Sequence, residues 1–379
     1  MKQEIAWTGS SNLEVAVTEL FNQLHEKPSQ VNLVMFFASV IYDFKELSEK
    51  IKEHFPASEV VGCSTSGEIS ENGFTKRGIV LTTMSCNQTK VKGVLVRAGA
   101  KFPMIEKDNI LSAMEECSIL TGKEISHKDS FAITFINGLC NAEECILSLL
   151  YAVVGDPRFQ VLGGSAGDDL KFQTTYVSLN GETITDGGVI VFVKTSKKFT
   201  IQKENIFKPS GRKVVLTGVD TASRKLVSIN HRPAASEYAS VVGISEARIG
   251  DASLMNPLGR MFGDNIFISS IAGVNPDHTL NMYCRVMPNT KVDIMQIGDV
   301  KSIMDATCDT IQSLIPKTGF VFLVNCILRT LAFENNDQGA YLVNLYQQRF
   351  NKVAGFSSYG EQIGKVNSNQ TLVVLAMEE

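Results

Sequence analysis

Several kinds of segment are missing from this 379-residue sequence. No apolar run reaches the roughly 18 residues that a membrane-spanning helix needs, and the N-terminus lacks the charged-then-apolar pattern of a secretory signal. The net charge is −4 and lysine and arginine form no cluster, which argues against a nucleic-acid-binding surface. The eight cysteines show no C-x-x-C spacing, so we expect reduced thiols and no zinc site. Together these absences predict a cytoplasmic protein.

The common catalytic and cofactor motifs are missing too. The sequence contains no P-loop, no dinucleotide-binding fingerprint, no H-E-x-x-H zinc motif and no C-x-x-C-H haem attachment motif. These absences remove the positive case for an enzyme, so we predict a protein that is not an enzyme, with no catalytic residues, no nucleotide and no metal.

What the sequence does contain is one short pattern in three copies. Each copy has an apolar strand end, a glycine, a serine and a carboxylate, and the copies read VVGCSTSGE at 60–68, VLGGSAGDD at 161–169 and VAGFSSYGE at 353–361. An apolar β-type run and a helix-like stretch precede each copy, and a further strand follows it. Glycines at strand ends bring bare backbone N–H groups and carboxylates to a sheet edge. The repeat is therefore expected to be a scaffold that places three polar loops on sheet edges.

The alternation of apolar runs with amphipathic stretches predicts an α/β fold. Four stretches place apolar residues at helical spacing, at about 42–54, 108–121, 141–154 and 300–315. Within the β-type segment 174–193, Asn180-Gly181 is a strong hairpin signal. We predict two domains of mixed β-sheets flanked by helices, with a repeated strand-helix-strand-strand unit. The polar, charged run at 194–205 is the expected boundary between them.

Five short motifs, in this order and spacing, resemble the bacterial FIST proteins: CSTSGE at 63–68, GGSAGDD at 163–169, NCILR at 325–329, GFSSYGE at 355–361 and NQTLVV at 369–374. The resemblance covers almost the whole chain. It implies a FIST N-terminal domain at 28–200 and a FIST C-terminal domain at 208–379. It also implies an intracellular signal-transduction sensor that binds a small, amino-acid-like ligand and modulates a signalling partner.

The chain is similar in length and in its CSTSGE motif to one subgroup of this family, the haem proteins that sense nitric oxide. Members of that subgroup act on a histidine kinase or a cyclic-di-GMP enzyme, so a haem-binding nitric oxide sensor is the alternative function. His231 and His278, both in turns of the second half, are the candidate haem ligands. Relatives often carry histidine before the C-terminal NQT, where this chain has Lys365-Val366-Asn367-Ser368, which argues against haem or a metal at that position.

Hydroxyl groups, carboxylates and backbone N–H groups beside glycines suit a small polar ligand. The expected ligand-binding residues are Ser64, Glu68, Ser165, Asp168, Asn325, Arg329, Ser357 and Glu361. Arg329 and Glu361 would together clamp a zwitterion, and Arg260 is a second candidate for binding an anion. The alternative interpretation is structural: the glycines allow tight turns, and the acidic residues cap the elements that follow.

A serine hydrolase is the less favoured alternative from another class. Gly163-Gly164-Ser165-Ala166-Gly167 matches G-x-S-x-G, whose serine must lie on a turn from a strand directly into a helix. The residues after this match read as β structure, so the sequence favours a binding role for Ser165 over a nucleophilic one.

Overall fold

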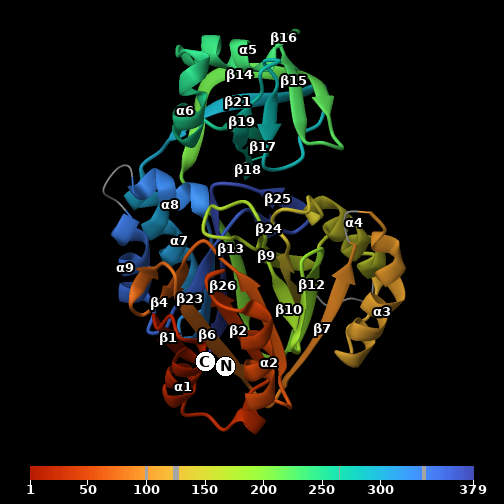
Figure 1. Ribbon diagram of the computed structural model, residues 1–379, viewed down its shortest axis with the longest axis vertical. Helices are drawn as coiled ribbons and strands as arrows, with labels where there is room; N and C mark the ends of the chain where they lie inside the picture. Colours follow the sequence, from red (N-terminus) through yellow and green to blue (C-terminus); the bar gives the residue numbers. More distant parts are fainter. Residues whose placement is uncertain (99–100, 123–127, 264, 335–338) are drawn as a thin grey trace.

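The computed structural model describes residues 1–98, 101–122, 128–263, 265–334 and 339–379. These residues form four β-sheets and nine α-helices, which confirms the predicted α/β class. Figure 1 shows a large main body and a smaller body above it, drawn in green and cyan, with the two chain termini side by side in the main body. Within the described residues, no helix is long and apolar enough to cross a membrane.

The main body consists of three units with nearly the same order of elements, the third having two helices where the others have one. The first contains β1 (Lys2–Thr8), α1 (Leu13–Asn22), β2 (Leu33–Ala38), α2 (Phe44–His54), β3 (Glu59–Ser64), β4 (Glu68–Ser70), β5 (Gly73–Thr75) and β6 (Ile79–Ser85). The second contains β7 (Thr89–Arg97), α3 (Lys107–Glu116), β8 (Ser130–Ile136), α4 (Glu143–Val154), β9 (Gln160–Ser165), β10 (Val177–Leu179), β11 (Glu182–Ile184) and β12 (Gly187–Thr195). The third contains β13 (Phe199–Asn205), α7 (Val300–Leu314), β22 (Thr318–Cys326), α8 (Ile327–Glu334), α9 (Gly339–Arg349), β23 (Ala354–Ser358), β24 (Glu361–Ile363), β25 (Val366–Ser368) and β26 (Thr371–Glu378).

The smaller body is an insertion between β13 and α7 of the third unit. It contains β14 (Phe207–Asp220), β15 (Lys225–Ile229), β16 (Arg232–Pro233), α5 (Ala234–Val242), α6 (Ile249–Met255), β17 (Leu258–Phe262), β18 (Asn265–Ser269), β19 (Ile271–Val274), β20 (Leu280–Met282) and β21 (Thr290–Ile297). Its strands form one antiparallel sheet around a separate apolar cluster. The sequence domains 28–200 and 208–379 stay a prediction, whereas in space the chain from α7 onward returns to the main body.

Local sequence signals account for several of these elements. Asn180 and Gly181 have φ angles of 53° and 88°, the left-handed pair that a tight hairpin turn requires, and they join β10 to β11 as predicted. The second predicted helix is shorter than expected, because the chain leaves α3 after Glu116 and Ser118 has a φ of 57°. The charged run at 194–205, expected as a boundary, largely forms edge strand β13, which pairs with β26.

In each unit, one hairpin pairs with a strand of another unit instead of its own. The hairpin β4–β5 of the first unit pairs with β23 of the third, β24–β25 of the third pairs with β9 of the second, and β10–β11 of the second pairs with β3 of the first. The exchange closes a ring, so no unit has a complete sheet of its own. The main body is therefore expected to fold cooperatively.

The central strands are buried on both faces, which explains why their sequences are continuous apolar runs. Their inner faces meet in one core where the three sheets converge, with Phe37, Phe135 and Phe322 from the three units in ring contact. Their outer faces are covered by helices: α1 and α2 on the first unit, α3 and α4 on the second, and α7 to α9 on the third.

The glycine shared by the three repeats lies where a side chain would strike the neighbouring strand. Gly62, Gly163 and Gly355 are the direct register partners of Phe36, Thr134 and Leu323 on the adjacent parallel strand. A Cβ on Gly163 would lie 2.0 Å from the Thr134 carbonyl oxygen, and one on Gly355 would lie 2.1 Å from that of Leu323. The repeated glycine is thus a packing requirement of the parallel strand pair.

Replacing Gly163 with alanine is expected to destabilise the fold by about 1–3 kcal/mol, because the new methyl group strikes backbone that cannot move without breaking strand pairing. Urea denaturation measures the effect. Gly250→Ala is the matched control, because no described atom outside its own helix and chain neighbours lies within 4 Å of the added Cβ, and alanine is favoured in helix α6. Equal stability of the two variants would contradict this account of the repeat.

Candidate functional site

The three repeated loops lie against one another at the C-terminal ends of β3, β9 and β23. A backbone hydrogen bond joins each pair of loops: Gly167 N to Ser64 O at 2.9 Å, Ser357 N to Gly67 O at 2.8 Å and Ser165 N to Gly360 O at 2.8 Å. The prediction that these loops gather at sheet edges is therefore met by the structure. Backbone N–H and C=O groups of the loops are thus used in hydrogen bonds that join the three units.

All eight predicted ligand-binding residues are inaccessible, with no side chain more than 1% exposed. Ser64 Oγ donates to the Gly167 carbonyl oxygen at 2.7 Å and accepts from Tyr176 N at 2.9 Å. The Asp168 carboxylate accepts from three consecutive backbone N–H groups, those of Phe172, Gln173 and Thr174. These contacts are the capping role that the structural interpretation of the loops predicts.

Glu68 and Glu361 occupy equivalent places in the first and third loops. Each accepts a 2.7 Å hydrogen bond from a loop hydroxyl, that of Thr65 or Ser358. Each also accepts a 3.1 Å bond from a backbone N–H, that of Gly78 or Thr371. Burial raises the pKa of Glu68 to about 8 and that of Glu361 to about 7, although these hydrogen bonds favour the charged form.

Arg329 does not meet Glu361, which corrects the predicted clamp. The Arg329 guanidinium forms an ion pair with Glu204 of β13, and both side chains are fully buried. Tyr346 Oη donates to the same carboxylate at 3.1 Å. Asn325 Nδ2 donates to Thr330 Oγ1 at 2.8 Å. Four buried atoms have no hydrogen-bond partner among the described residues: Arg329 Nε, Arg329 Nη1, Asn325 Oδ1 and Ser357 Oγ.

Ser165 does not lie on a nucleophile elbow. The chain continues from β9 through a loop to hairpin β10–β11, with no helix directly after the serine. Ser165 Oγ donates to Glu143 Oε1 at 2.9 Å and accepts from Gln362 Nε2 at 3.1 Å. The serine is thus held between a carboxylate of α4 and an amide of β24, and no histidine of the described residues forms a hydrogen bond with it.

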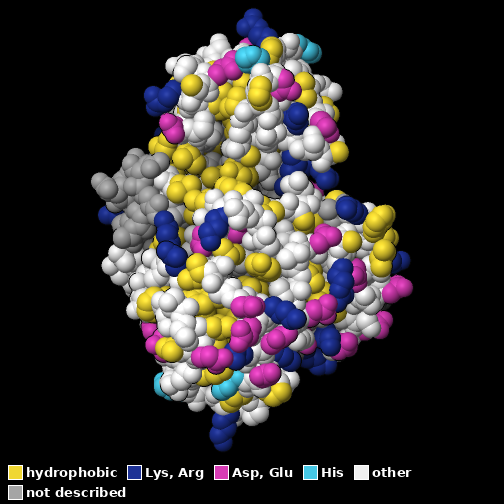
Figure 2. All heavy atoms as spheres, in the orientation of Figure 1, with side chains coloured by type: hydrophobic (Ala, Val, Ile, Leu, Met, Phe, Trp, Pro, Cys, Tyr) yellow, Lys and Arg dark blue, Asp and Glu magenta, His cyan; other side chains and the backbone are white. Residues whose placement is uncertain are grey.

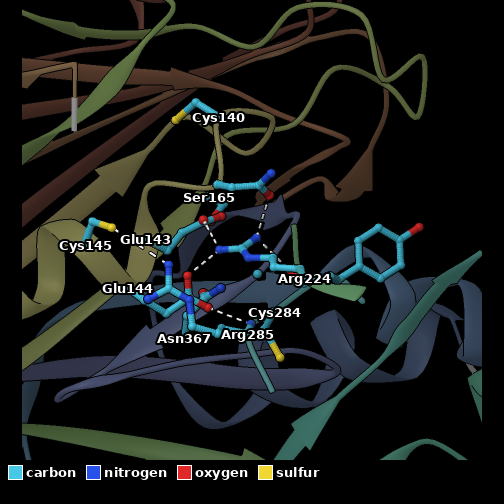
Figure 3. Close-up of polar contacts among 12 residues, drawn as sticks. Cys140, Glu143, Glu144, Cys145, Ser165, Arg224, Cys284, Arg285 and Asn367 are labelled. Carbon is cyan, nitrogen blue, oxygen red and sulfur yellow. Dashed lines mark hydrogen bonds and ion pairs between the residues drawn. The ribbon is translucent and has the colours of Figure 1, made fainter. Parts of the chain in front are cut away.

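The contact of Ser165 with Glu143 belongs to a buried joint between the two bodies (Figure 3). Arg224, on the turn between β14 and β15, reaches from the smaller body to the first turn of α4. Its guanidinium pairs with Glu143 at 2.6 Å and with Glu144 at 2.5 Å, and Arg224 and Glu143 are 4% and 3% exposed. Arg285 N of the smaller body donates to Glu144 Oε1 at 2.8 Å. We call these four residues the Arg224 joint.

A cleft of about 180 Å³ lies beside the Arg224 joint, between the two bodies. It is lined by Glu144, Leu216, Arg260, Phe267, Ile268, Ser269, Arg285, Val286, Met287, Thr290, Val292, Lys365, Val366 and Asn367. Figure 2 shows the junction as a waist, with Lys and Arg side chains gathered on one side of it. Arg260 and residues 365–367 of the segment before the C-terminal NQT, which the sequence singles out, therefore contribute to a cavity.

The histidines proposed as haem ligands lie at the surface of the smaller body. His231 is exposed in a turn, and His278 is 56% exposed, with its Nδ1 in a 2.8 Å hydrogen bond with Glu246 Oε2. A haem ligand needs an apolar pocket, so neither position fits one. No group of three His, Cys, Asp or Glu side chains among the described residues could hold a metal ion.

The residues that sequence reasoning missed are those of the Arg224 joint, together with Gln362. Glu143 and Glu144 stand at the start of a predicted helix, where acidic residues are common for reasons of helix stability alone. Arg224 lies in a polar turn between two strands, and nothing in the sequence of that turn marks it as functional. Only the approach of the two bodies gives these positions a shared role.

The two buried glutamates are expected to make the fold less stable as pH rises. Between the unfolded pKa of 4.5 and the folded values of about 7 to 8, the folded state binds more protons than the unfolded state. Each group then lowers the free energy of unfolding by up to about 1.4 kcal/mol per pH unit. In denaturant titrations from pH 5 to 8, Glu68→Gln and Glu361→Gln should each reduce this decline relative to wild type. An unchanged slope in both variants would contradict the assignment.

The buried pair of Arg329 and Glu204 is expected to be costly to break, because one partner alone leaves an uncompensated charge. Arg329→Met and Glu204→Gln should each cost about 3–5 kcal/mol of unfolding free energy, and the double variant less than their sum. The control is Arg248→Met, which breaks an exposed pair with Asp251 and should cost about 1 kcal/mol or less. Single variants no worse than this control would show that the pair is dispensable.

The chain was compared with known proteins. Residues 32–232 match the FIST N domain and residues 234–364 match the FIST C domain. An uncharacterised protein of Methanocaldococcus jannaschii is 20% identical, in an alignment that covers 92% of this chain and 73% of that protein. A chorismatase structure aligns with 99% of this chain and 97% of its own, at 10% identity and a TM-score of 0.36. A cyanuric acid hydrolase aligns over 99% of both chains, at 9% identity and a TM-score of 0.33. TM-scores this low carry no argument about fold or activity.

The match to the FIST N domain alone spans more than half of the sequence, and this chain therefore belongs to the FIST family, with a FIST N and a FIST C domain.

Proposed function

We propose that this chain is a signal-transduction sensor that binds a small, amino-acid-like ligand and reports its presence through the junction of its two bodies. Membership of the FIST family, whose domains are sensory, supports the general role. The observation that supports the mechanism is the Arg224 joint, because it is buried, ionic and made between the bodies.

The junction combines apolar contacts with several buried hydrogen bonds. Besides the Arg224 joint, Asn369 N donates to Ile268 O at 3.2 Å, and Gln370 Nε2 donates to Leu254 O at 2.9 Å. Polar interfaces between bodies of one chain resemble those of transient complexes, for which relative motion is the default expectation. A junction of this kind can exchange one set of hydrogen bonds for another when a ligand arrives.

A ligand shifts a conformational equilibrium only by its difference in affinity for the two states. Glu144 supplies such a difference, because it lines the cleft and also holds Arg224 of the smaller body. A ligand that contacts Glu144 changes the charge that Arg224 faces. Through Glu143 the same guanidinium is one contact away from Ser165 of the second repeated loop.

The partner that we propose for this sensor is a histidine kinase or an enzyme of cyclic-di-GMP metabolism. Ligand occupancy would then change the activity of that partner through the smaller body. In this role the chain itself is not an enzyme, and the contacts that occupy Ser165 Oγ support that assignment over hydrolysis.

A thermal-shift screen against the amino acids tests the sensor. A ligand at 100 times its dissociation constant adds about 2.7 kcal/mol to the stability of the folded state. For each ligand found, hydrogen exchange should change at 221–229 and 141–146, on the two sides of the Arg224 joint, because binding alters the contacts there. The segment 131–136 in the buried core of the main body is the internal control and should not change. Binding that leaves exchange at the joint unchanged would contradict the sensor mechanism.

A further inference from the structure

We infer that the cleft between the two bodies is a binding site for a small organic carboxylate with an apolar body, held by Arg285, Lys365 and Asn367. This inference deepens the proposed function and rests on it, since it names the class of ligand that the sensor reads. It follows from the charges, the free donors and the walls of the cleft, taken in turn.

The cleft carries an excess of positive charge. Arg260, Arg285 and Lys365 line it, and its one acidic residue is Glu144, which is already paired with Arg224. Within the described residues, none of the three cations forms a salt bridge. Arg260 and Lys365 instead lie near aromatic rings, those of Phe267 and Tyr151, with the charged groups 5.9 and 5.1 Å from the ring centroids. Three cations without carboxylate partners in one cavity favour an anionic ligand.

Arg285 and Asn367 have hydrogen-bond donors to spare. Arg285 is half-buried, and its Nη2 makes only a long contact of 3.9 Å with Cys145 Sγ, while its Nε is a buried donor without a partner among the described residues. Asn367 is 6% exposed, and its Oδ1 accepts from Gln362 Nε2 at 3.0 Å, which leaves the Nδ2 donors for the cavity that it lines. A guanidinium presents its N–H groups as a planar fork that matches a carboxylate. The chemistry of these donors therefore fits a carboxylate group.

Apart from Ser269 and Thr290, the remaining walls are apolar, and the space is small. Leu216, Phe267 and Val286 come from the smaller body, and Val366 comes from hairpin β24–β25 of the main body. The volume of about 180 Å³ lies below the range of drug-sized pockets, roughly 300–1,000 Å³. A compact metabolite with one apolar group and one charged end suits these dimensions.

Two sources of a carboxylate are distinguished by Glu144. Each oxygen of a carboxylate has two lone pairs. On Glu144, Oε1 accepts a hydrogen bond from Arg285 N and Oε2 accepts one from the Arg224 guanidinium. The remaining lone pairs can accept from the ammonium of an amino acid. An oxo acid of the same shape lacks that group but keeps the carboxylate.

Isothermal titration calorimetry with three matched probes tests the site: L-leucine, its 2-oxo acid and L-leucinamide, with the L-phenylalanine set as a second size. The acids should bind and the amides should not, because only the acids offer a carboxylate to Arg285. Arg285→Ala should weaken binding by about 10- to 100-fold, the loss expected for a charged hydrogen bond. Lys365→Ala, at an exposed position with no salt bridge among the described residues, should weaken it without disturbing the fold.

The matched control is Arg248→Ala, which removes an arginine of the same body whose partner is the exposed Asp251, and it should leave binding unchanged. Binding of an amide as tight as that of its acid would overturn the proposal. So would unchanged affinity in both Arg285→Ala and Lys365→Ala, or the absence of binding by every acid. Carboxylate binding that depends on Arg285 but leaves hydrogen exchange at the Arg224 joint unchanged would uphold this site and reject the sensor mechanism.

Discussion

The exchange of hairpins among the three units is the constraint on which the rest of this structure depends. A strand pair gains its stability from hydrogen bonds and side-chain contacts with neighbours, and here each unit finds part of them in another unit. The repeated loops lie at the crossing points. Their backbone groups are buried and must be paired, because an unpaired buried amide costs free energy comparable to a lost hydrogen bond. The loops therefore bind one another across the units.

This constraint decides where a ligand can go. The hydroxyls and carboxylates of the loops look like a binding site when read along the chain. In the folded molecule, though, Ser64, Asp168 and Glu361 are committed to neighbouring loop groups and are inaccessible. Three cations that form no salt bridge among the described residues, Arg260, Arg285 and Lys365, instead line the cleft where the inserted smaller body meets hairpin β24–β25. The loops hold the main body together, and the insertion creates the cleft. Ser165 connects the two, because it belongs to a loop and also contacts the Arg224 joint.

Much of the local structure follows from sequence patterns. The apolar runs predict buried strands, Asn180-Gly181 predicts its hairpin, and the repeated strand context predicts a repeated unit. The helices near 42–54, 141–154 and 300–315 lie close to their predicted positions. The run at 194–205, predicted as a boundary, largely forms edge strand β13, because an edge strand needs only partial burial and its sequence can be as polar as a linker.

The sequence by itself determined the α/β class, the threefold repeat and the family, since these depend on periodicity and on motifs that are local to the chain. The tertiary structure alone decided which unit receives each hairpin, that Arg329 pairs with Glu204 rather than Glu361, and that Arg224 meets Glu143. The physical reason is the same in each case. These contacts join residues that are more than 80 positions apart, or depend on which charge lies nearest once water is excluded. No spacing along the chain encodes that choice. Likewise, Lys365 and Arg260 are visible as candidates in the sequence, but only the folded structure places them in the same cleft.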